Sequence, residues 1–93
     1  MTEHQQRLWK EMIGLLDAYS RGEIDFGTLV GRLEGALDAA EFSDRQLVKR
    51  WYDAWTPLET HRSVRGPVVP ISEVTASVEA MRRFLVEEAP EPR

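Results

Sequence analysis

Hydrophobic side chains recur every three or four positions along most of this chain, the spacing that gathers them on one face of an α-helix. Four such stretches are separated by residues that typically end or begin helices. They predict helices over residues 3–20, 26–41, 44–64 and 73–88. Because the links between them are short, consecutive helices should pack as neighbours. The chain is therefore predicted to be all-α, a small bundle of about four helices.

Residues with known capping preferences stand at the predicted helix boundaries. Gly22 lies where the first helix should end in a left-handed conformation. Asp25 is placed to cap the second helix, Ser43 to form a capping box with Gln46 at the third, and Ser72 to cap the fourth. These signals predict where each helix begins independently of the hydrophobic pattern.

Prolines interrupt the helical pattern at two places. Pro57 lies inside the third predicted helix, where it lacks a backbone N–H and crowds the preceding turn, so we expect a kink or a break near Thr56. Residues 66–70 contain two further prolines, which exclude a helix and favour an extended segment. We expect this segment to lay Val68 and Val69 against the core.

Length and composition are typical of a small globular domain. With 93 residues, 42% hydrophobic and 30% charged, the chain has room for one core, so we predict one helical domain over residues 1–93, with 90–93 as a frayed tail. There is no cysteine, which excludes disulfides and thiolate metal sites. No apolar run approaches the ~20 residues of a membrane span, and residues 1–6 lack the pattern of a secretory signal. These features predict a cytoplasmic protein with no membrane partner.

Trp51 and Trp55, four positions apart on the third predicted helix, are expected to form the centre of the core.

Residues that support catalysis are few and scattered. His4 and His61 have no carboxylate three or four positions before them, so the helical Glu-x-x-His metal pattern is absent and both should be exposed and solvated. No phosphate-binding glycine loop occurs. We therefore expect no enzymatic activity, no metal and no cofactor.

Charge is unevenly distributed, although the net charge is only −4. Residues 22–44 contain six acids and one base, whereas residues 45–66 contain five bases and two acids. Glu34, Asp38 and Glu41 follow one another at helical spacing and form an acidic ridge beside the apolar face of the second predicted helix. The commoner explanation is that adjacent helices exchange surface ion pairs. The alternative is an acidic docking face that attracts a basic protein.

The bases of the third predicted helix suggest another function, nucleic-acid binding. They are Arg45, Lys49, Arg50, Arg62 and Arg65. The acidic total argues against this alternative, and neither helix junction resembles a helix-turn-helix. A protein-binding module is therefore the favoured hypothesis.

Three glycines spaced by four, Gly27, Gly31 and Gly35, form a second ridge on the second predicted helix. The two in its interior should together cost the helix about 2 kcal/mol relative to alanine. Small residues at this spacing allow another backbone to approach closely. We therefore expect a closely packed helix on this ridge or, if none covers it within the chain, a two-fold homodimer.

The stretch from Leu15 to Val30 resembles the opening of small bacterial immunity proteins of the colicin D and self-protective colicin-like type. In these, an amphipathic helix ends in Gly-Lys/Glu-Ile-Ser/Asp and a second follows at once. The matching positions are Leu16, Tyr19, Gly22, Glu23, Ile24, Asp25, Leu29 and Val30. The resemblance implies a cytoplasmic helical bundle that neutralises a basic toxin, with acidic side chains standing in for substrate phosphates. By position and charge, Glu34, Asp38 and Glu41 are the natural candidates.

Overall fold

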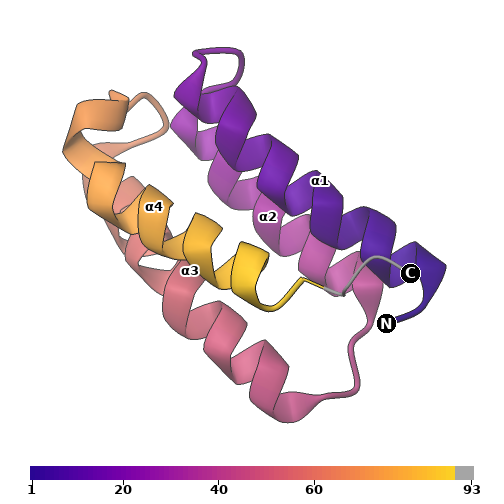
Figure 1. The fold of residues 1–93 in the computed structure, drawn as a ribbon. Coiled ribbons are helices and arrows are strands. Elements are labelled where there is room, and N and C mark those ends of the chain that lie inside the picture. Colours follow the sequence, from indigo (N-terminus) through magenta and orange to yellow (C-terminus); the bar gives the residue numbers. More distant parts are fainter. Residues whose placement is uncertain (90–93) are drawn as a thin grey trace.

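The computed structural model describes residues 1–89, which contain four α-helices. They are α1 (Glu3–Ser20), α2 (Phe26–Ala40), α3 (Arg45–Arg65) and α4 (Ile71–Glu87). Consecutive helices contact one another, and α4 packs back against α1 to close the bundle (Figure 1). The predicted all-α bundle of four helices is confirmed. The predicted tail, residues 90–93, lies outside the described residues.

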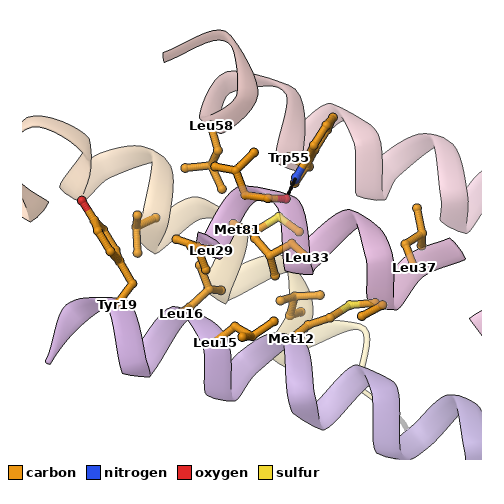
Figure 2. Close-up of a cluster of buried hydrophobic side chains, with 14 of the residues drawn as sticks. Met12, Leu15, Leu16, Tyr19, Leu29, Leu33, Leu37, Trp55, Leu58 and Met81 are labelled. Atoms are coloured by element: carbon orange, nitrogen blue, oxygen red, sulfur yellow. Dashed lines mark hydrogen bonds between the residues drawn. The ribbon is translucent and has the colours of Figure 1, made fainter. Parts of the chain in front are cut away.

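The apolar faces predicted from the spacing meet in one core to which all four helices contribute (Figure 2). Its fully buried side chains include Trp9, Met12, Leu33, Trp51 and Met81. Each buried tryptophan N–H has an acceptor, as the polar edge of an indole requires when it is removed from water. Trp9 Nε1 donates to Leu85 O (2.7 Å), Trp51 Nε1 to Met12 Sδ (3.3 Å) and Trp55 Nε1 to Val30 O (3.1 Å).

Two of the predicted helix boundaries are confirmed in detail. Gly22 adopts a left-handed conformation with φ 77° just after α1. Asp25 caps α2, and its Oδ1 accepts a hydrogen bond of 2.7 Å from Thr28 N. Together they turn the chain within the few residues that separate α1 from α2.

The predicted caps of the other two helices are wrong. Asp44, not Ser43, caps α3, because its carboxylate accepts hydrogen bonds from both Gln46 N and Leu47 N and its charge suits a helix N-terminus. Helix α4 begins at Ile71 rather than at residue 73, with Pro70 at its N-cap and no side-chain hydrogen bond. Ser72 is therefore the second residue of α4 and cannot be its N-cap, and the first hydrogen bond of the helix runs from Glu73 N to Pro70 O at 3.0 Å.

Helix α3 is not broken at Pro57, in contrast to one of the two outcomes expected there. It continues without interruption from Arg45 to Arg65. Trp55, which precedes the proline, and Leu58, which follows it, are both buried. Burial of both side chains in the same core favours one continuous helix, since tertiary packing overrides the local cost of a proline.

The link between α3 and α4, residues 66–70, is extended and crosses the bundle end beside the turn between α1 and α2 (Figure 1). Gly27 N donates to Pro67 O at 3.0 Å, and the Tyr19 hydroxyl donates to Val69 O at 2.5 Å. Val69 is buried as expected, but Val68 is 78% exposed. Successive side chains of an extended segment point to opposite sides, so only one of the two valines reaches the core.

Candidate functional site

Two of the acidic residues singled out from the sequence, Glu34 and Asp38, lie on α2 near Tyr52 of α3. Glu41 directly follows α2, and we call these three residues the acidic flank. Glu34 is half-buried, whereas Asp38 and Glu41 are exposed. Helix α2 ends at Ala40, one residue earlier than predicted, because Glu41 adopts a left-handed conformation. The helix therefore carries two of the three acids, and the third extends the flank past its C-terminus.

Tyr52 of α3 holds one of these carboxylates in place. Its hydroxyl donates a hydrogen bond of 3.1 Å to Glu34 Oε2. Its ring lies 5.2 Å from that of Trp51 and 5.6 Å from that of Trp55, edge-on in both cases. Burial raises the pKa of Tyr52, as do the hydrogen bond to Glu34 and the charges of Glu34 and Asp38. Sequence reasoning missed Tyr52, because its helical spacing indicates a core residue and says nothing of its hydroxyl.

The surface bases of α3 are largely neutralised by neighbours on α3 and α4. Four of its five bases form ion pairs: Lys49 with Asp53, Arg50 with Glu88, Arg62 with Glu59 and Arg65 with Glu73. Within residues 1–89, no ion pair includes Glu34, Asp38 or Glu41. Adjacent helices therefore exchange surface ion pairs as expected, between α3 and α4 and between α1 and α4, but within residues 1–89 none joins an acid of α2 to a base of α3. The fold brings Tyr52, not a base, to Glu34.

Two members of the acidic flank, Asp38 and Glu41, occupy positions that are locally unfavourable for the helix. The C-terminus of a helix carries a partial negative charge, so Asp38 in the last turn of α2 is repelled by it. No basic residue lies in that turn. Glu41 adopts φ 51°, a conformation that costs a residue with a side chain about 1–2 kcal/mol and for which glycine is the usual choice. Each of these features lowers the stability of α2.

The backbone carbonyls of the last two residues of α2 have hydrogen-bond partners among the side chains in the first turn of α1. His4 Nε2 lies 3.2 Å from Ala39 O, and Gln5 Nε2 donates to Ala40 O at 3.0 Å. Orphan carbonyls at a helix end need such partners or water. Helix α1 thus fixes the end of α2 from which Glu41 projects.

The glycine ridge is not covered by a helix. Apart from the neighbouring backbone of α2, no atom of residues 1–89 lies within 4 Å of a Cβ built on Gly31 or Gly35, and both residues are exposed. Gly27 alone is closely approached, by Pro67 of the link between α3 and α4 rather than by a helix. The predicted close packing is therefore wrong for Gly31 and Gly35 within the chain. The homodimer alternative stays a prediction.

The two histidines differ more than their sequence context indicates. His4 is exposed, as expected. His61 is half-buried: its Nε2 lies 3.4 Å from Glu73 Oε2, and its ring meets the ring of Phe26 edge-on. Glu73 lies on the next helix, so spacing within α3 could not reveal the contact. Within residues 1–89, no three His, Asp or Glu side chains are grouped closely enough to hold a metal ion.

An apolar hollow of about 330 Å³ lies at the bundle end, between the turn from α1 to α2 and the link from α3 to α4. Three polar side chains line it, those of Tyr19, Ser20 and Asp25. All three already form hydrogen bonds. The Tyr19 hydroxyl donates to Val69 O, the Ser20 hydroxyl donates to Leu16 O, and the Asp25 carboxylate accepts from Thr28 N. The hollow therefore offers no convergent set of free polar groups of the kind that orients a substrate.

Comparisons with protein-family models, with curated proteins and with solved structures found no match to this chain. Among the helices of residues 1–89, none combines the length and the apolar character needed to cross a membrane. The function must therefore be inferred from the chain's own residues. The acidic flank is a feature that the fold itself does not explain.

Proposed function

We propose that this protein is a non-catalytic binding module whose acidic flank docks onto a basic surface of a partner protein. The observation that carries the proposal is the placement of Glu34, Asp38 and Glu41. No base within residues 1–89 neutralises them, and Asp38 and Glu41 oppose the stability of their helix. Residues that break local rules without benefit to the fold are expected at functional sites.

The immunity-protein resemblance gives this proposal its most specific form, in which the partner is the basic catalytic domain of a toxin in the cytoplasm. A nuclease binds its substrate through the phosphates with lysine and arginine. Carboxylates spaced along one helix flank offer the same charge to that surface. In this form of the proposal, the acidic flank covers the toxin's active site and blocks access of its substrate.

Tyr52 and Glu34 favour arginine over lysine as the group that the partner presents. A guanidinium donates two parallel hydrogen bonds to a carboxylate and stacks on aromatic rings, whereas an ammonium acts as a point charge. Glu34 is held in place by the Tyr52 hydroxyl, and Tyr52 is held by two indole rings. A carboxylate that is already positioned loses less conformational entropy on binding.

The pairing of the α3 bases supports this proposal over nucleic-acid binding. Arg62 has a carboxylate partner on α3 and Arg65 one on α4, and the partner of Arg50 is Glu88 at the C-cap of α4. Binding to phosphates would have to break these pairs, and the overall charge of −4 opposes the approach of nucleic acid. A gel-shift assay at low salt should show no retardation at micromolar protein.

Two triple variants test the proposal. The first neutralises the acidic flank (Glu34→Gln, Asp38→Asn, Glu41→Gln). The second makes the same change in net charge at exposed acids elsewhere (Glu11→Gln, Glu79→Gln, Glu87→Gln). Affinity capture from the native host with the wild-type chain identifies the partner, and association rates are then measured with the purified pair over a range of salt concentrations.

The flank variant should associate at least about tenfold more slowly at low salt and show a weaker salt dependence, because steering by a local charged face is lost. The control variant should associate nearly as the wild type does. If the two variants slow association equally, the effect comes from net charge and not from the acidic flank, which contradicts the proposal. A flank variant that associates at the wild-type rate would contradict it as well.

A further inference from the structure

We draw no further inference here: the strongest candidate, the apolar hollow of about 330 Å³ between the turn from α1 to α2 and the link from α3 to α4, is bordered by the exposed side chains of Val68 and Ile71, but nothing in the structure shows what covers it.

Discussion

The two ends of α2 are built from similar residues but stand in opposite surroundings. At its N-terminus, Asp25 caps the helix and Gly27 lies against Pro67. Toward its C-terminus, Gly31 and Gly35 face open space, and Glu41, directly after the helix, adopts a left-handed backbone conformation. A glycine and an acid thus stabilise one end of the helix, whereas the same residue types destabilise the other.

This difference shows that a residue type has no fixed meaning apart from its contacts. At Gly27 a side chain would lie 2.7 Å from Pro67 Cβ and 3.2 Å from Pro67 Cα, so the fold requires glycine there. At Gly31 and Gly35 the described chain makes no such demand. The N-terminal end of α2 therefore serves the fold, whereas the C-terminal end carries the docking surface that we propose.

The largest expected effect is that of Gly27→Ala, which should lower the free energy of unfolding by about 1–3 kcal/mol. The added methyl group would meet the rigid ring and backbone of Pro67, so the link between α3 and α4 would have to shift. Urea denaturation monitored by tryptophan fluorescence measures this loss. A Gly27→Ala variant as stable as the wild type would show that the close approach of Pro67 is absent in solution.

The opposite result is expected at the other glycines. Gly31→Ala and Gly35→Ala should each raise the free energy of unfolding by about 1 kcal/mol, since alanine is the better helix former and open space surrounds both positions. Gly31→Leu should also raise the melting temperature. If Gly31→Leu instead destabilises the protein or dissociates a dimer in analytical ultracentrifugation, a second copy covers this surface.

A smaller gain is expected from Glu41→Gly. Relief of the left-handed conformation is worth about 1–2 kcal/mol, and the greater freedom of glycine in the unfolded chain offsets about 0.5–1 kcal/mol of it. Thermal unfolding should therefore show a net gain of about 0.5–1 kcal/mol. Glu41→Gln keeps the side chain and removes the charge, so it separates the backbone effect from the electrostatic one. If Glu41→Gln raises the free energy of unfolding as much as Glu41→Gly does, the cost of Glu41 arises from its charge and not from its backbone conformation.

The smallest effect concerns the pH dependence contributed by the cap of α2. The hydrogen bond from Thr28 N lowers the pKa of the Asp25 carboxyl below its ordinary value of 3.8. Its contribution to stability is thus fully present above that value and is lost as the pH falls through the lower pKa of the folded state. Asparagine caps helices equally well without a charge.

Urea unfolding at several acidic pH values compares Asp25→Asn with Asp38→Asn, which makes the same charge change at the other end of α2. The acid-induced loss of stability should be smaller in Asp25→Asn than in the wild type. If Asp25→Asn follows the wild-type curve at every pH, the cap does not contribute to acid sensitivity.

Much of the fold could be predicted because its signals are local. Helix spacing placed Trp51 and Trp55 in the core, where both are buried. Gly22 and Asp25 end one helix and start the next as expected. One failure also has a local cause. Asp44 directly follows Ser43, and its carboxylate, not the Ser43 hydroxyl, accepts the hydrogen bonds from Gln46 N and Leu47 N.

The candidate site was predictable only in part. Glu34 and Asp38 share a flank because 3.6 residues make a turn, a property of the chain alone, whereas Glu41 lies past the end of α2. That they form no ion pairs within residues 1–89 depends on which side of α3 faces them. Tyr52 could not be identified beforehand, since the bond that its hydroxyl makes joins two helices.

The sequence by itself determined the four helices, their apolar faces and, to within one residue, most of their ends. Backbone hydrogen bonding, capping and side-chain periodicity operate within a few residues. Only the tertiary structure decided what each surface position meets. It set Pro67 against Gly27 and left Gly31 open, and it paired His61 with Glu73 across two helices. These contacts depend on how the helices are placed relative to one another, which the packing of the whole core determines.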